Sequence, residues 1–124
     1  MKARNHTPED YKTFCEWWEQ WGWPAVPESF IPPQSIVVEQ DGKPICAVFI
    51  YKTDTPIIWA ENYISDRNSH LRGKALDFLI AEMLSTFKNC VIMSSVKNRS
   101  LAKRLETGGF IKCDENLTNY VIKV

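Results

Sequence analysis

The chain has 124 residues, a length that suits one domain burying roughly two thirds of the surface of its unfolded chain, so we expect a single domain over residues 1–124. Lysine plus arginine total 15, as do aspartate plus glutamate, which excludes a broad basic field for nucleic acid or acidic membranes. We therefore expect no nucleic-acid partner. The chain start lacks an apolar leader and no stretch is long enough to span a bilayer, so we expect a cytoplasmic protein without membrane contact.

The four cysteines are widely spaced and form no C-x-x-C pair, and His6 and His70 are the only histidines. This pattern argues against a metal site. Cys46, Cys90 and Cys113 fall in apolar, strand-like stretches, where we expect reduced, buried thiols, as is typical of a reducing compartment.

The first predicted element is a helix with Thr7 as N-cap and Pro8 at its first position, running to about Trp21. Gly22 ends it, and the prolines that follow predict an irregular loop. Aromatic side chains recur along the helix at three- and four-residue spacing, at Tyr11, Phe14, Trp17, Trp18 and Trp21. Such a stripe normally packs on a sheet, but its tryptophans, with Trp23, could instead line an acceptor pocket or a protein-contact surface.

Three β-rich segments follow, at residues 35–40, 44–52 and 57–64, and they predict an antiparallel meander. Asp41-Gly42 between the first two is a strong hairpin signal. A helix of about five turns is predicted from Leu71 to Phe87, because apolar residues recur with helical spacing.

A short strand at residues 90–96 should pair in parallel with the strand before the helix. Asn98 is placed to cap a last helix that Gly108-Gly109 ends. Residues 110–113 and 117–124 predict a C-terminal β-hairpin around residues 114–116, whose edge could pair across a homodimer. The fold class is therefore α/β with a mixed sheet.

The segment His70-Leu71-Arg72-Gly73-Lys74-Ala75 lies at the start of the long predicted helix. The first turn of a helix presents several backbone N–H groups in one direction, which suits a diphosphate. Gly73 would let phosphate oxygens approach the backbone, and Arg72 and Lys74 would add positive charge. The alternative is a glycine that only eases a turn.

A second motif combines Asn98 and Leu101 with Gly109-Phe110. Through the order of its elements and these two motifs, the chain resembles the GCN5-related N-acetyltransferase (GNAT) family over nearly its whole length. The glycine and the small residue of the family's Q/R-x-x-G-x-G/A signature match Gly73 and Ala75, whereas His70 replaces the first residue. The Trp- and Pro-rich start looks in particular like small acyltransferase-like proteins of phages and prophages, which would place the protein in a host cytoplasm.

The resemblance implies an enzyme that transfers an acyl group from acetyl-CoA or another acyl-CoA to an amine of a small molecule or protein, without a metal. It also implies that the amine attacks the thioester directly. The residues implied to hold the acyl-CoA are His70, Arg72, Gly73, Lys74, Ala75, Leu76 and Asn98.

Glu61, in the middle of a strand, is the candidate catalytic base, since burial there would raise its pKa toward neutrality. Alternatively, Glu61 faces solvent or a cationic neighbour. The tyrosine that often protonates the thiolate in the family is replaced by Leu105, with Tyr63 or Tyr120 as conceivable substitutes. This difference leaves a second hypothesis open: a non-catalytic GNAT-like binding or virion-associated module that contacts a partner through its aromatic N-terminal face.

Overall fold

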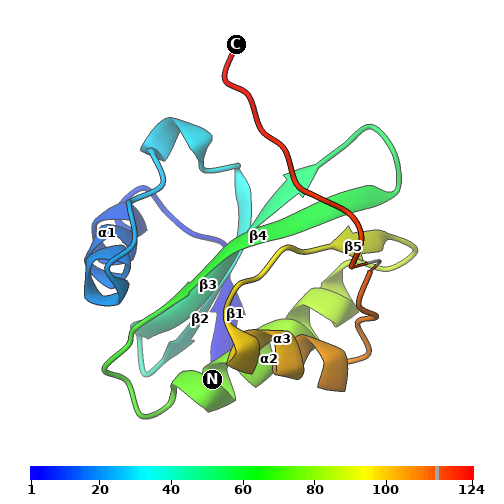
Figure 1. The fold of residues 1–124 in the computed structure, drawn as a ribbon. Helices are drawn as coiled ribbons and strands as arrows, with labels where there is room; N and C mark the ends of the chain where they lie inside the picture. The colour runs from blue at the N-terminus through cyan, green and yellow to red at the C-terminus, as the bar shows by residue number, and fades with distance from the viewer. Residues whose placement is uncertain (114) are drawn as a thin grey trace.

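In the computed structural model, which describes residues 1–113 and 115–124, the central feature is a five-stranded mixed sheet in the order β1-β2-β3-β4-β5 (Figure 1). Neighbouring strands are antiparallel except for β4 and β5, which run parallel. The predicted meander and the parallel strand-helix-strand unit are confirmed. The strands are β1 (Lys2–Arg4), β2 (Gln34–Gln40), β3 (Lys43–Lys52), β4 (Ile57–Ser65) and β5 (Val91–Met93).

The β2–β3 hairpin turns at Asp41 and Gly42, whose φ angles are 53° and 77°. Two consecutive residues with positive φ are what a two-residue type I′ turn requires, which is why Asp-Gly was a reliable signal here. The turn pairs Gln40 with Lys43, and a register shift between Val38 and Glu39 then places Val38 opposite Cys46.

Helices cover both faces of the sheet (Figure 1). Helix α1 (Asp10–Trp21) lies on one face, where Phe14, Trp17 and Trp18 pack against Val37, Ala47, Phe49 and Ile64. Helices α2 (Arg72–Thr86) and α3 (Arg99–Thr107) belong to the core on the other face. A short 3₁₀ helix, η1 (Glu28–Phe30), interrupts the proline-rich loop. The aromatic stripe of α1 is therefore mainly core packing.

The start of α1 differs from the prediction, because Thr7 is not its N-cap. The Thr7 N–H instead donates to Asp10 Oδ2 at 2.7 Å. Asp10 is buried and also accepts two hydrogen bonds from the Arg4 guanidinium, at 2.7 and 2.9 Å. Arg4 lies on β1, a strand that the sequence analysis missed, so this cluster joins the edge of the sheet to the first turn of α1.

The C-terminal β-hairpin is wrong for the residues that the structure describes: 110–113 and 115–124 contain no strand, and the side chains of Val121 and Ile122 are exposed. Asp114, part of the predicted turn, lies outside the described residues. Cys90 and Cys113 are exposed rather than buried, whereas Cys46 is buried as expected. The strand predicted at residues 90–96 is shorter in the structure: β5 spans Val91–Met93, and residues 94–96 lie outside the sheet.

Each described helix is too short or too polar to cross a membrane. In the same part of the chain, no group of three or more His, Cys, Asp or Glu side chains is placed to hold a metal ion.

Candidate functional site

The sheet opens between β4 and β5. Their paired residues end at Trp59 opposite Met93, although β4 continues to Ser65. The β3–β4 register also shifts near Asn62, which has a φ of 57°. This bulge changes the alternation of side chains, so that Ala60 and Tyr63 both reach the core on the α2 side. The edge of β4 beyond Trp59 is left without a β5 partner in the described ladder.

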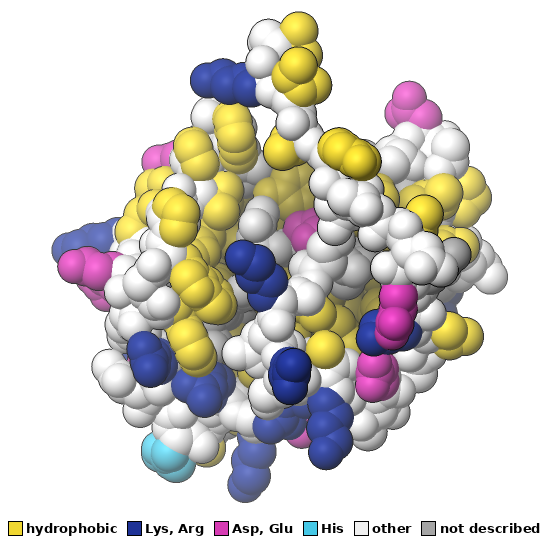
Figure 2. Space-filling model, viewed as in Figure 1, with side chains coloured by type: hydrophobic (Ala, Val, Ile, Leu, Met, Phe, Trp, Pro, Cys, Tyr) yellow, Lys and Arg dark blue, Asp and Glu magenta, His cyan; other side chains and the backbone are white. Residues whose placement is uncertain are grey.

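Two adjoining hollows of about 470 and 880 Å³, mouths included, lie at this opening. Both are lined by Trp23, Tyr63, Asn98 and Leu101, so they form one groove. Arg72 and Leu76 of α2 line one end, and Glu61 lines the other. Figure 2 views this face, where acidic and basic groups lie in a hollow among apolar side chains.

Some of the backbone N–H groups at the start of α2 already have partners. The Arg72 N–H donates to Ser69 O at 3.3 Å, and the Ala75 N–H donates to Leu71 O at 2.9 Å. Leu76 lies further inside the helix. Within the described part of the chain, Gly73 and Lys74 are therefore the two positions whose N–H groups remain available at this helix start.

Arg104 of α3 lies against Gly73. Its Nη1 donates to Gly73 O at 3.2 Å and to Asp77 Oδ1 at 2.7 Å. A Cβ added at Gly73 would lie 2.8 Å from Arg104 Nη2, so the absence of a side chain makes room for this guanidinium. No local sequence pattern indicates this contact, since the two residues are separated by a helix and a strand.

Two further guanidinium groups stack on the aromatic segment beside the groove. Arg67 and Arg72 each place their Cζ atom 5.1 Å from the centre of the Trp21 ring, and Trp23 stacks on the same ring at 5.2 Å. Trp23 is 43% exposed, whereas Trp17 and Trp18 are each 3% exposed. Of these tryptophans, Trp23 lines both hollows.

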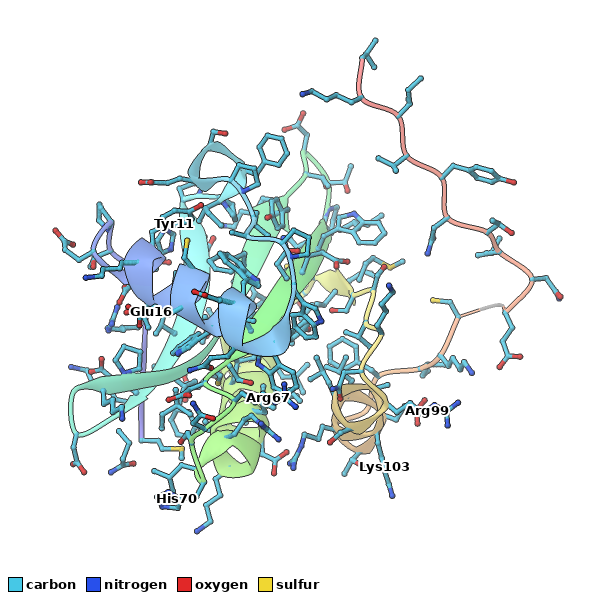
Figure 3. All side chains as sticks on the ribbon, turned by 60° about the vertical axis from the view of Figure 1, so that its left-hand side comes forward. Tyr11, Glu16, Arg67, His70, Arg99 and Lys103 are labelled. Atoms are coloured by element: carbon cyan, nitrogen blue, oxygen red, sulfur yellow. The ribbon has the colours of Figure 1, made fainter. Side chains whose placement is uncertain are left out.

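The other predicted cofactor residues lie in the turn before α2, in the first turn of α2 and at the start of α3. His70 is exposed in the turn before α2, at the outer end of that helix (Figure 3). Ala75 is buried beneath the first turn. Asn98 caps α3 as predicted, with its Oδ1 accepting from the Leu101 N–H at 3.0 Å, and it also lines the groove. Arg99 and Lys103 point outward from α3 in Figure 3.

Glu61 is half-buried at the far end of the groove. Its Oε1 accepts a hydrogen bond from the Ser95 N–H at 2.9 Å, so its described partner is a backbone amide rather than a cation. Burial raises the pKa of the Glu61 carboxyl, although the hydrogen bonds from Ser95 oppose this shift. The sequence did not indicate Ser95, because its role depends on where the backbone leaves the sheet after β5.

The two tyrosines considered as proton donors differ in position, because Tyr63 lines both hollows of the groove whereas Tyr120 lies in the segment after α3. The Tyr63 hydroxyl lies 2.8 Å from Ser94 Oγ, which donates to Ala60 O, and burial raises the pKa of Tyr63 to about 12. Tyr120 is exposed. Leu105 is buried in the core, where α3 packs beside α2.

No protein-family model matches the sequence, and the search of curated proteins finds no match. Solved structures do match over the full fold. A GNAT-family acetyltransferase from Streptococcus pneumoniae TIGR4 is 11% identical with a TM-score of 0.71, and the match covers 99% of this chain and 95% of that one.

The ribosomal-protein-alanine N-acetyltransferase of Brucella melitensis biovar Abortus 2308 is 13% identical with a TM-score of 0.64, and the match covers 100% of both chains. At such low identity these similarities establish the fold alone. The chain has the fold of GNAT acetyltransferases, as the sequence motifs predicted.

Proposed function

We propose that the protein is an N-acyltransferase that uses acetyl-CoA or a related acyl-CoA and acts on an amine. The observation that carries this proposal is the single groove that joins the first turn of α2 to the half-buried Glu61. A groove with Arg72 and a helix start at one end, and a carboxylate of raised pKa at the other, would meet the two requirements of acyl transfer from a nucleotide-linked thioester.

At the α2 end, the N–H groups of Gly73 and Lys74 would donate to the diphosphate, assisted by the positive end of the helix dipole. The guanidinium groups of Arg72 and Arg104 flank this position and would balance the negative charge. Gly73 fits this role, because any side chain there would displace Arg104.

Along the groove, β4 has no described β5 partner after Trp59. Ala60 O accepts from Ser94 and Ser65 O accepts from Trp21, and an extended chain would pair with backbone groups of β4 between them. The pantetheine arm contains two amides that can pair with such an edge. When bound, the acyl-CoA supplies a thioester, whose acyl carbon would lie toward Glu61.

At the acceptor end, Glu61 would take a proton from the incoming ammonium group, and its raised pKa suits this task near neutral pH. The amine lone pair then forms the C–N bond as the C–S bond breaks. Of the two protons that the nitrogen loses, one reaches Glu61 and then solvent, and the other neutralises the leaving thiolate. The net products are an amide, CoA thiol and one proton.

The alternative of a non-catalytic module, which arose from Leu105 at the usual tyrosine position, would contact its partner through the aromatic N-terminal face. Phe14, Trp17 and Trp18 are buried against the sheet, which leaves Trp23 as the exposed tryptophan of this region, at the groove. The arrangement therefore favours a ligand groove over a broad docking face.

Titration of the protein with acetyl-CoA, CoA and longer acyl-CoAs by calorimetry tests the proposal. Saturable binding at micromolar concentrations followed by thiol release with an amine acceptor is the expected result. Absence of binding up to millimolar concentrations would reject an acyl-CoA enzyme.

A further inference from the structure

The hollow at the Glu61 end carries two opposite charges beside an apolar wall. Among the described residues that line it, Glu61 and Lys97 are the ionised ones. Its apolar lining comes from α1 and the loop after it, through Trp18, Trp23, Pro24 and Val26, and from Val96 on the opposite side. An acceptor that fills this hollow therefore meets an anion, a cation and an aromatic surface.

The segment after β5 contacts the Glu61 side chain and also contains Lys97. The Ser95 N–H fixes Glu61 Oε1, and this same segment leads directly to Lys97. Asn98 then caps α3, which fixes the backbone just after Lys97. The described hydrogen bonds of Glu61 all come from Ser95, so the carboxylate has no described cationic partner and can pair with an incoming ammonium group. Lys97 has no described acidic partner at salt-bridge distance.

The apolar wall is anchored from behind by Trp21. Trp23 stacks on Trp21, whose Nε1 donates to Ser65 O at 2.8 Å. Trp23 is thus supported from behind while it remains 43% exposed toward the groove. A flat apolar group placed against it would gain burial without displacing a core residue.

We propose that the acceptor is a free α-amino acid with an apolar, preferably aromatic, side chain. This inference rests on the proposed function. The ammonium group would lie at Glu61, the carboxylate at Lys97 and the side chain against Trp23, so each feature of the molecule meets its complement. A polyamine or a lysine-rich peptide would bring additional positive charge toward Lys97, which disfavours those acceptors.

The bonds and protons in this transfer are accounted for as in any amide synthesis from a thioester. The ammonium form gives one proton to Glu61, and the nitrogen forms a bond to the acyl carbon while the carbon–sulfur bond breaks. The second nitrogen proton is transferred to the thiolate, which leaves an N-acylamino acid, CoA thiol and the proton that Glu61 releases. Lys97 takes no part in these steps and acts by positioning the carboxylate.

Three acceptors that share the same aromatic side chain separate this inference from other amine classes: phenylalanine, phenylalaninamide and phenethylamine. With acetyl-CoA and a thiol-release assay, kcat/KM for phenylalanine should exceed the values for the other two by about tenfold or more, as expected for one charge-assisted contact. Phenylalaninamide represents the amino terminus of a peptide, so it distinguishes a free amino acid from a protein acceptor.

Variants of Lys97 test whether its charge causes the preference for phenylalanine. Lys97→Gln should raise KM for phenylalanine and leave KM for phenethylamine unchanged, while Lys97→Arg retains the preference. Lys88→Gln, an exposed charge change at the opposite end of α2 from the groove, serves as the matched control.

The results distinguish a failure of the amino-acid assignment from a failure of the proposed acyl-CoA site. If acetyl-CoA binds but phenethylamine or phenylalaninamide is acylated as well as phenylalanine, or none of the three is acylated, the amino-acid assignment is overturned and the acyl-CoA site stands. If acetyl-CoA does not bind, the proposed function fails, and this inference fails with it.

Discussion

The Arg104 guanidinium occupies the space beside Gly73 that a side chain would fill, 2.8 Å from the position of an added Cβ. The contact joins the last helix to the first turn of α2 through hydrogen bonds to Gly73 O and Asp77 Oδ1. This packing contact accounts for the presence of glycine at position 73. It also brings a positive charge to the N-terminus of α2. The two explanations are compatible, because both need an open backbone at position 73.

Arg104→Gln should weaken acetyl-CoA binding by about tenfold, the effect of losing one charge-assisted contact. The ion pair with Asp77 is largely exposed, so the free energy of unfolding should change by about 1 kcal/mol or less. Calorimetric titration measures the first effect, and urea unfolding measures the second. Asp77→Asn is the matched control, since it removes the same ion pair but keeps the guanidinium; a comparable loss of affinity in that variant would contradict a direct role for Arg104.

Glu61→Gln should reduce kcat/KM by about 10² to 10⁴, the range typical of a lost general base. A base acts when deprotonated, and burial raises the pKa of Glu61, so the wild-type rate should rise with pH with a midpoint above that of an ordinary glutamate. The variant should lack this rise.

The stability of the same variant provides the control. A carboxyl whose pKa is raised in the folded state destabilises the fold once pH exceeds that pKa, because the charged form is poorly solvated. Glu61→Gln should therefore be at least as stable as wild type at pH 7. Full turnover by this folded variant would remove Glu61 from the mechanism.

The tryptophans of α1 and the loop after it should divide into a structural and a ligand-contacting group. Trp18→Ala removes a buried side chain and should cost about 3–5 kcal/mol of stability. Trp23→Ala should cost about 1 kcal/mol or less, because its stacking on Trp21 is partly exposed, yet it should raise KM for an apolar acceptor. Unfolding curves and initial rates check both; an unchanged KM in Trp23→Ala would place the acceptor elsewhere.

The elements that the sequence predicted well are those with strong local rules. Asp41-Gly42 specified the turn of the β2–β3 hairpin, and Asn98 capped α3 through its own side chain. The bulge at Asn62 had no such signal, because a positive φ at asparagine follows from how β4 meets β3. That bulge determines which side chains of β4 face the α2 side of the sheet, so the orientation of Glu61 and Tyr63 could not be read from alternation alone.

The errors have a common cause, since they concern segments whose structure depends on distant partners. Thr7 looked like an N-cap, but Asp10 accepts its N–H and binds Arg4 on a strand too short to show a pattern. The C-terminal residues have strand-like composition, yet an apolar run forms a strand only where a sheet edge receives it. Cys90 and Cys113 were placed in the interior by the same reasoning and are exposed.

Asp10→Asn should destabilise the protein by about 1–3 kcal/mol at pH 7, because it removes a charge that hydrogen-bonds Arg4 in a mostly buried position. Hydrogen bonds from Arg4 lower the pKa of Asp10 in the folded state, so its stabilisation is present above the unfolded pKa and is lost as pH falls through the folded value. The difference between variant and wild type should therefore shrink in acid. Unfolding measured from pH 7 down to pH 2 tests this, and a constant difference would contradict it.

The central claim is that the first turn of α2 binds the diphosphate of an acyl-CoA, and Gly73→Trp tests it most directly. The bulky side chain would cover the backbone at position 73, and the clash meets only the flexible end of Arg104, so the variant should still fold. In calorimetric titration with acetyl-CoA, wild type should bind saturably at micromolar concentrations and Gly73→Trp should not bind. Equal binding by both proteins, or no binding by wild type up to millimolar concentrations, would contradict the account.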